Sequence, residues 1–264
     1  MLKEKEVELF YDNVGGTYGD HDNRLCDEIL EYFILKYLPN RKIKILDAGG
    51  GIGRFSIPLA KKENLVVLSD ISQVMLENAE IIAKKNKIKN IQFVKESVTD
   101  MKNQNNNSFD VVLAMNAILD YCENHDKALK EIFRVLKPGG VLIGSVNNRF
   151  IYCTEHELND GNFKLFRKSM DSGDRFISWR IKKGHWTHEF TLDELNKSIK
   201  ARGFRIVKVL GVFNLLGKYA QQDWLKDRSM RKKLFLLQIQ YAEKEEYVNN
   251  STDYFFVAKK PMYL

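Results

Sequence analysis

The residues most suited to chemistry lie in one stretch, KIKILDAGGGIGRFSIPLA, which covers residues 42–60. A short apolar run ends at Asp47, and glycines then follow at every second position, Gly49, Gly51 and Gly53. A glycine-rich turn after a strand lets the backbone approach a ligand closely. The carboxylate before the turn would repel a pyrophosphate, and it suits a ligand that carries a positive charge near the turn.

Two other glycine-rich loops do not fit this stretch. A loop that binds nucleoside triphosphates needs the pattern G-x-x-x-x-G-K-[ST], and the required Lys and Ser or Thr are absent. A dinucleotide loop needs G-x-G-x-x-G, and its third glycine would fall on Arg54 or on Ser56, depending on the starting glycine. The sequence therefore indicates a different ligand.

Further motifs follow in a fixed order. Asp70 ends the run LVVLSD about 23 residues after Asp47, where a carboxylate can accept hydrogen bonds from both hydroxyls of a ribose. The segments SDISQVMLENAE (69–80) and FRVLKPGGVLIGSV (133–146) come next. Over residues 40–150 this ordered set resembles the class I S-adenosylmethionine-dependent methyltransferases.

The resemblance implies a role for each matching position. The three glycines would approach the methionine part of S-adenosylmethionine, Asp47 would help to hold that region, and Asp70 would bind the ribose. In relatives an acid after the third strand contacts the adenine amino group, whereas this chain has Ser97 there, which makes a weaker contact. The expected cofactor-binding set is Tyr18, Arg24, Asp47, Ala48, Gly49, Gly51, Gly53, Asp70, Ile71, Met75, Ser97, Val98, Ala114, Met115 and Asn116.

Each of these residues also has a structural alternative. Asp47 could cap the turn, Asp70 could cap a helix, Met75 could be a core residue and Ser97 could be a simple turn residue. The ordered set of motifs, more than any one residue, favours the functional interpretation.

Apolar runs of strand type alternate with segments of helical period, which predicts parallel strands with helical crossovers. The fold class we expect is α/β, a doubly wound, seven-stranded, mostly parallel sheet of the Rossmann-like methyltransferase type with helical lid insertions. The expected strands are residues 43–47, 65–70, 91–96, 109–115, 141–146, 204–212 and 254–260; the expected helices are 56–63, 73–85, 125–136 and 191–202.

The domain organisation follows from this order. We expect a single methyltransferase domain over residues 1–264, with a helical cap at 1–40 and the cofactor-binding half at 41–146. Residues 147–190 and 213–253 break the rhythm and are expected to cover the substrate as a lid. The asparagine-rich piece KNQNNNS (102–108) is expected to be an exposed loop.

Several residues are candidates for contact with the methyl acceptor. His188, Asp120 and Tyr121 are the proposed catalytic residues, with His185 as a further candidate base. The aromatic and charged candidates for lining the substrate site are Tyr11, Tyr18, Arg24, Phe150, Tyr152, Phe163, Phe166, Phe176, Trp179 and Trp186. The run AMNAILDY after strand four lacks the N/D-P-P-[YF] motif, which argues against methylation of adenine N6 in DNA. No metal is expected.

Composition leaves three functions open. The net charge is +7, the three cysteines are far apart, and no apolar run approaches 18 residues, so we expect a cytoplasmic protein without a membrane span. The leading interpretation is methylation of O, N or C on a small molecule. The alternatives are an RNA or protein methyltransferase, favoured by the charge, and a methyltransferase-like partner protein without catalysis, favoured by Ser97. The oligomeric state is not predicted.

Overall fold

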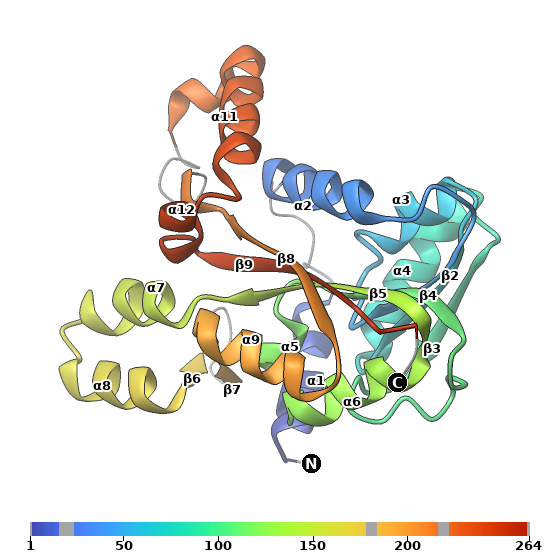
Figure 1. Ribbon diagram of the computed structural model, residues 1–264, viewed down its shortest axis with the longest axis horizontal. Coiled ribbons are helices and arrows are strands. Elements are labelled where there is room, and N and C mark those ends of the chain that lie inside the picture. Colours follow the sequence, from blue (N-terminus) through green and yellow to red (C-terminus); the bar gives the residue numbers. More distant parts are fainter. Residues whose placement is uncertain (1, 16–23, 178–183, 216–221, 263–264) are drawn as a thin grey trace.

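The structure, a computed structural model, describes residues 2–15, 24–177, 184–215 and 222–262 (Figure 1). Its centre is a seven-stranded sheet with the order β3-β2-β1-β4-β5-β9-β8. Strands β1 to β5 are parallel, and β9 runs antiparallel to both β5 and β8. The strands are β1 (Lys44–Ala48), β2 (Leu65–Asp70), β3 (Ile91–Lys95), β4 (Phe109–Ala114), β5 (Leu136–Asn147), β8 (Arg205–Val212) and β9 (Asp253–Lys259). The predicted fold class is confirmed.

Helices cover both faces of the sheet, which is why its central strands are apolar at nearly every position. One face packs α2 (Arg24–Tyr37), α3 (Ser56–Lys61) and α11 (Arg228–Tyr241) in a single apolar cluster. The other face packs α5 (Ile118–Tyr121), α6 (His125–Val135) and α9 (Leu192–Ala201). Figure 1 shows α2, α3 and α11 above the sheet and α6 and α9 below it.

Side-chain caps fix where the crossover helices begin. Ser72 Oγ accepts the Met75 N–H at the start of α4 (Gln73–Lys85), and Asn124 Oδ1 accepts the Lys127 N–H before α6. Thr191 accepts the Glu194 N–H before α9, as the capping-box spacing predicted. These caps place the ends of the preceding loops, where the polar residues of the site lie.

The expected start of strand five was wrong. Strand β5 begins at Leu136, directly after α6, and includes Pro138 and the two glycines that follow it. The pairing of β4 with β5 shifts register between Phe109 and Val111, which accommodates this irregular beginning. The Lys260 Nζ donates to the Leu136 carbonyl at 2.8 Å and closes the same corner.

The lid, residues 147–190, holds elements that the sequence did not predict. It contains α7 (Arg149–Cys153), a π-helical turn (Thr154–Leu158), α8 (Phe163–Ser172) and a two-stranded antiparallel hairpin of β6 (Asp174–Ile177) and β7 (His185–His188). All are short and mix exposed aromatic with buried charged residues, so no hydrophobic period reveals them. In Figure 1 they lie at the lower left.

The second insertion and the N-terminal region are helical in the described residues. They contain α1 (Leu2–Val14), a 3-10 turn (Asp223–Lys226), α11 and α12 (Glu245–Asn249). Among the described residues no helix combines the length and the apolar character needed to cross a membrane.

An ion-pair network fastens the lid to the core. Arg149 Nη2 contacts Glu194 Oε2 of α9, and its Nε donates to the Glu189 carbonyl at 3.0 Å. The two ring nitrogens of His188 lie 3.0 Å from Asp174 Oδ1 and 2.8 Å from Glu194 Oε1. This network joins β6, β7 and α7 to the start of α9.

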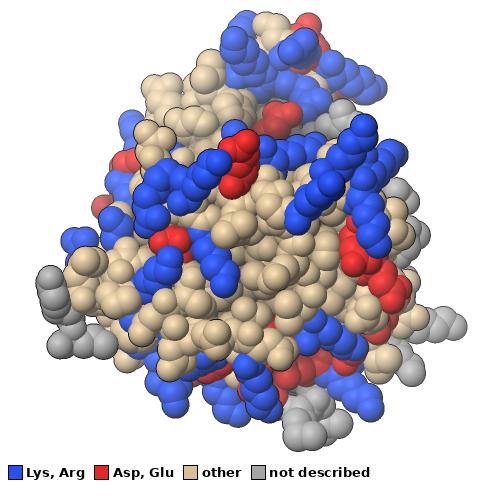
Figure 2. All heavy atoms as spheres, turned by 90° about the vertical axis from the view of Figure 1, so that its right-hand side faces the viewer, with Lys and Arg blue, Asp and Glu red and all other residues tan. Residues whose placement is uncertain are grey.

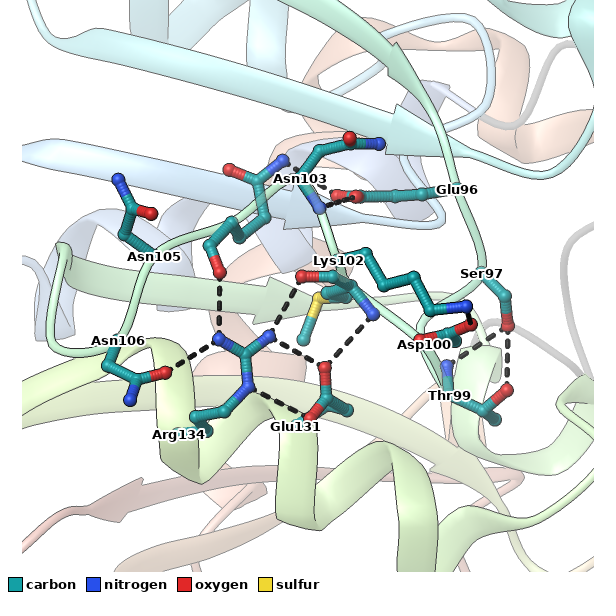
Figure 3. Close-up of polar contacts among 12 residues, drawn as sticks. Glu96, Ser97, Thr99, Asp100, Lys102, Asn103, Asn105, Asn106, Glu131 and Arg134 are labelled. Carbon is teal, nitrogen blue, oxygen red and sulfur yellow. Dashed lines mark hydrogen bonds and ion pairs between the residues drawn. The ribbon is translucent and has the colours of Figure 1, made fainter.

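The asparagine-rich segment after β3 is fixed by one arginine of α6 (Figure 3). Arg134 donates to the Met101 and Gln104 carbonyls at 2.8 and 2.7 Å and is paired with Glu131. Gln104 in turn donates to Glu96 at 2.7 Å. The expected exposed loop is confirmed for most of residues 102–108, while Gln104 is buried and Arg134 holds the loop where it leaves β3.

We expect Arg134→Met to lower the free energy of unfolding by about 2 kcal/mol, because buried carbonyls would lose charged donors. Urea unfolding followed by circular dichroism measures this loss. Arg202→Met is the matched control, since Arg202 makes only a solvent-exposed pair with Asp126. Equal losses in the two variants would contradict the fixing role of Arg134.

The lid network predicts a pH dependence of stability. Burial alone would lower the pKa of His188, but the hydrogen bonds to Glu194 and Asp174 outweigh it and raise that pKa above its usual value. A raised pKa stabilises the folded state fully below the unfolded pKa, about 6.5, and the gain is lost as the pH rises through the folded pKa. His188→Gln should therefore cost roughly 1–3 kcal/mol at pH 6 and clearly less at pH 9. Urea unfolding at both values tests this, and a pH-independent cost would refute it.

Candidate active site

A cleft opens at the carboxyl ends of the parallel strands, where loops after β1, β2, β3 and β4 meet. It encloses about 810 Å³, including space open to solvent. The lining residues are Glu4, Val7, Tyr11, Gly49, Gly50, Gly51, Ile52, Arg54, Asp70, Ile71, Met75, Glu96, Ser97, Val98, Met115, Asn116, Ile118, Tyr121 and Cys122. In open α/β sheets ligands bind at this edge.

The glycine turn forms one wall of the cleft. Gly49 and Gly51 have φ values of +70° and +53°, in the left-handed region that favours glycine. A Cβ at Gly49 would lie 2.3 Å from Ile118, whereas one at Gly51 would meet no atom within 4 Å. The backbone at Gly51 therefore faces free space and can approach a ligand.

Asp70 joins the turn to the end of β2. Its Oδ2 accepts the Gly51 N–H at 2.9 Å and its Oδ1 accepts the Ser72 N–H at 2.9 Å. Burial raises the pKa of this carboxyl group, while these backbone donors act in the opposite direction. The side chain lines the cleft and carries acceptor oxygens that suit a pair of hydroxyls.

Asp47 lies behind the turn and does not line the cleft. Its Oδ2 accepts a hydrogen bond from Ser56 Oγ of α3, and a Cβ on Gly50 would lie 2.8 Å from the same oxygen. Burial raises the pKa of Asp47 to about 6. The structure thus gives Asp47 a role beneath the turn and not at its open face.

Helix α1 lines the cleft with Tyr11, as expected, and also carries acidic residues that the sequence analysis missed. Glu4, Glu8 and Asp12 recur every four residues and so share one face. Glu4 Oε1 accepts hydrogen bonds from Ser97 Oγ at 2.5 Å and from Thr99 Oγ1 at 2.7 Å. Glu8 pairs with Lys95, and Asp12 accepts from Ser72 Oγ at 2.6 Å. The acidic spacing in the sequence was the available signal, although nothing local reveals its partners.

Two successive residues after β4 adopt the left-handed conformation without being glycine. Asn116 and Ala117 have φ values of +53° and +64°, and Asn116 lines the cleft. The Asn116 N–H donates to Ser145 Oγ and the Ala117 N–H to the Ser145 carbonyl, at 2.9 and 3.1 Å. Backbone strain of this kind is found most often at functional sites.

The structure brings most of the expected cofactor-binding residues together. Those that line the cleft are Gly49, Gly51, Asp70, Ile71, Met75, Ser97, Val98, Met115 and Asn116. Asp47, Ala48, Gly53 and Ala114 do not line it, and Gly53 packs instead on Ile57 and Leu68. Tyr18 and the side chain of Arg24 lie outside the described residues.

A second cavity of about 1170 Å³, including space open to solvent, lies within the lid. Its lining residues are Tyr121, Asn147, Tyr152, His156, Glu157, Asp160, Asn162, Leu165, Arg175, Phe176, Ile177 and Glu189. Tyr121 lines both spaces, so the lid cavity adjoins the cleft at this residue.

The catalytic candidates divide between these spaces and the core. Tyr121 lies between the two cavities. His188 lines neither, and both its ring nitrogens are engaged in the lid network, so it is not placed as a base. Asp120 is fully buried with Oδ1 accepting the Asn147 N–H at 2.9 Å, and burial raises its pKa well above the usual value. His185 is buried between the rings of Phe10 and Tyr121.

The aromatic candidates also separate. Tyr11 lines the cleft, and Tyr152 and Phe176 line the lid cavity. Phe150 and Phe163 are exposed on the outside of the lid, Phe166 and Trp186 line neither space, and Trp179 lies outside the described residues. The described part of the chain contains no group of three or more side chains that could hold a metal ion.

Comparison with curated proteins finds relatives that differ in acceptor. The chain is 25% identical over 259 residues to the tRNA 5-carboxymethoxyuridine methyltransferase of Escherichia coli K12, covering 97% of this chain and 94% of that protein. It is 32% identical over 124 residues to a ubiquinone biosynthesis O-methyltransferase of Rickettsia canadensis, covering 46% of this chain and 51% of that enzyme. The second match is confined to about half of each protein.

Solved structures share the fold. A possible histamine N-methyltransferase of Thermotoga maritima superposes with a TM-score of 0.61 at 18% identity, covering 96% of this chain and 99% of that one. A magnesium protoporphyrin IX methyltransferase of Synechocystis PCC 6803 with bound S-adenosylhomocysteine gives 0.61 at 16% identity, covering 98% and 99%. A family model described as a methyltransferase domain matches residues 39–194. With its strand order, glycine turn and cleft, the chain belongs to the class I S-adenosylmethionine-dependent methyltransferases.

Proposed function

We propose that this methyltransferase transfers the methyl group to O, N or C of a small molecule held in the lid cavity. The observation that carries the proposal is the pair of adjoining cavities that share Tyr121. The first is built from the turns at the strand ends, and the second is walled by the lid and large enough for one small acceptor. Holding two reactants in adjoining spaces is the main requirement for a transfer between them.

The residues of the cleft fit S-adenosylmethionine. Gly51 leaves its backbone open, Asp70 offers acceptors for the ribose, and Ile71, Met75 and Val98 give apolar walls for a flat base. When bound, the cofactor supplies a methyl group already activated by a positively charged sulfur, so the protein has mainly to align the nucleophile.

Glu4 would complete the cofactor seat in this proposal. Ser97 lies two residues beyond the end of β3, next to Glu96, and donates to the Glu4 carboxylate; all three side chains line the cleft. A carboxylate accepts a hydrogen bond from an amino group more strongly than a hydroxyl does. Glu4 would therefore provide at the adenine the negative charge that Ser97 lacks.

We expect Glu4→Gln to weaken binding of S-adenosylhomocysteine roughly tenfold, because an amide loses the charge assistance of the carboxylate. Isothermal titration calorimetry measures the dissociation constant. Glu6→Gln is the matched control, since Glu6 is an exposed glutamate on the same helix. Unchanged affinity in Glu4→Gln would remove Glu4 from the cofactor seat.

A second candidate function is methylation of RNA. It is favoured by the match to the tRNA enzyme, which covers 97% of this chain, whereas the match to the ubiquinone biosynthesis O-methyltransferase covers 46%. The net charge of +7 agrees with it. However, Figure 2 shows Lys and Arg interspersed with acids on the face at the right of Figure 1, whereas the lid lies at the left.

A turnover assay with two kinds of methyl acceptor, a small-molecule extract and bulk tRNA, distinguishes the two functions. We expect release of S-adenosylhomocysteine with a nuclease-treated small-molecule extract and none above background with bulk tRNA. Turnover only with tRNA, lost after nuclease treatment and falling steeply with salt, would reject the small-molecule proposal.

A further inference from the structure

The polar wall of the lid cavity holds buried carboxylate oxygens without partners. Arg175 Nε donates to Glu157 Oε1 at 2.7 Å, and its Nη1 donates to Glu189 Oε1 at 3.2 Å. Within the described residues the second oxygens, Glu157 Oε2 and Glu189 Oε2, have no hydrogen-bond partner. These two side chains are 4% and 1% exposed. One guanidinium thus lies between two carboxylates, and half of their acceptor capacity is unused.

Negative charge exceeds positive charge around the cavity. Glu157, Asp160 and Glu189 line it, and Arg175 is the sole lysine or arginine among the described lining residues. A further buried acid, Asp120, lies near Glu189. Burial raises the pKa of Asp120, and repulsion from Glu189 raises it further.

Asp253 extends the same acidic group. It lies 3.4 Å from the hydroxyl of Tyr152, which lines the cavity. Burial, with repulsion from Glu189 added, raises the pKa of Asp253 to about 7. The raised pKa values of Asp120 and Asp253 therefore reflect the negative potential that Glu189 adds at this wall.

Such an arrangement lowers the stability of the folded protein. A buried carboxylate without full pairing is destabilising, and each unmet acceptor adds a desolvation penalty. An added positive charge in the cavity would remove both costs. A metal ion does not fit this role, because the described residues offer no group of three metal-binding side chains.

The rest of the lining suits an organic cation. The rings of Tyr121, Tyr152 and Phe176 line the same cavity, and the guanidinium of Arg175 already lies 5.7 Å from the Tyr152 ring centroid. Aromatic faces attract ammonium and guanidinium groups and also pack against an apolar body.

We propose that the methyl acceptor carries a positively charged nitrogen group, an ammonium or an amidinium, that binds Glu157 and Glu189 in the lid cavity. This inference rests on the proposed function, in which the lid cavity holds a small-molecule acceptor. An acceptor that presents a carboxylate or a phosphate to this wall would meet the excess of acidic residues in the lining and is disfavoured.

Three probes that differ in one group test the inference. Tryptamine, tryptophol and indole-3-propionate share a ring and have side chains of similar length that end in an ammonium, a hydroxyl and a carboxylate. Binding to the enzyme saturated with S-adenosylhomocysteine is measured by calorimetry, with ligand-observed NMR for weak binding. We expect tryptamine to bind at least tenfold more tightly than indole-3-propionate, with tryptophol between them.

Variants that replace a glutamate by glutamine test whether Glu157 and Glu189 cause the preference for tryptamine over indole-3-propionate. Glu157→Gln and Glu189→Gln should each reduce the tryptamine preference about tenfold, because each removes one negative charge from the wall. Glu155→Gln, an exposed glutamate of the same π-helical turn, should leave it unchanged. Unchanged binding of S-adenosylhomocysteine and an unchanged melting temperature show that each variant is folded.

Several results would overturn the inference. These are equal or tighter binding of indole-3-propionate, no tryptamine binding at millimolar concentration, or an unaltered preference in both glutamine variants. The proposed function fails separately, through turnover restricted to tRNA, because the probe experiment measures charge preference without turnover.

Discussion

The active site depends on one constraint, the left-handed glycine turn held between the ends of β1 and β2. Gly49 and Gly50 donate to the Ser69 carbonyl at 2.8 and 3.0 Å, and Gly51 donates to Asp70. These bonds fix the backbone where neighbouring parallel strands end, so that every later loop adds its polar groups to the same edge. The cleft, the residues of α1 that line it and Tyr121, which also lines the lid cavity, all lie at this edge.

The lid shows how a fold can retain charges that do not stabilise it. Arg149, His188 and Glu194 are paired with one another, and they fasten the lid to α9. Glu157 and Glu189 share Arg175 and keep one oxygen each without a partner in the described part of the chain. The first group explains how the lid is attached; the second leaves buried acceptor atoms unmet, which agrees with the proposed binding of a cation at this wall.

The sequence predicted what local chemistry determines. Alternation of apolar runs with helical segments predicted a doubly wound, mostly parallel sheet, Thr191 and Glu194 predicted a helix start, and the glycine spacing predicted the turn. The sequence did not show which residues lie on the open side of the turn and which lie behind it. Asp47 and Asp70 both end a strand, and Gly51 and Gly53 belong to the same turn, so only tertiary packing distinguishes the members of each pair. The contact of Glu4 with Ser97 joins distant parts of the chain, and the β6–β7 hairpin has no period of its own. Such features depend on long-range packing that a local pattern does not contain.

The charges on the two sides of Tyr121 suggest why these cavities adjoin. Transfer of a methyl group from a sulfonium moves positive charge out of the cofactor cleft and towards the acceptor. Fixed groups that favour the charge where it arrives stabilise the transition state more than the ground state. In the proposed function the carboxylates of the lid wall, Glu157 and Glu189, lie on the acceptor side. Their unfavourable burial and the favourable potential that they would offer to the transfer are therefore the same physical property.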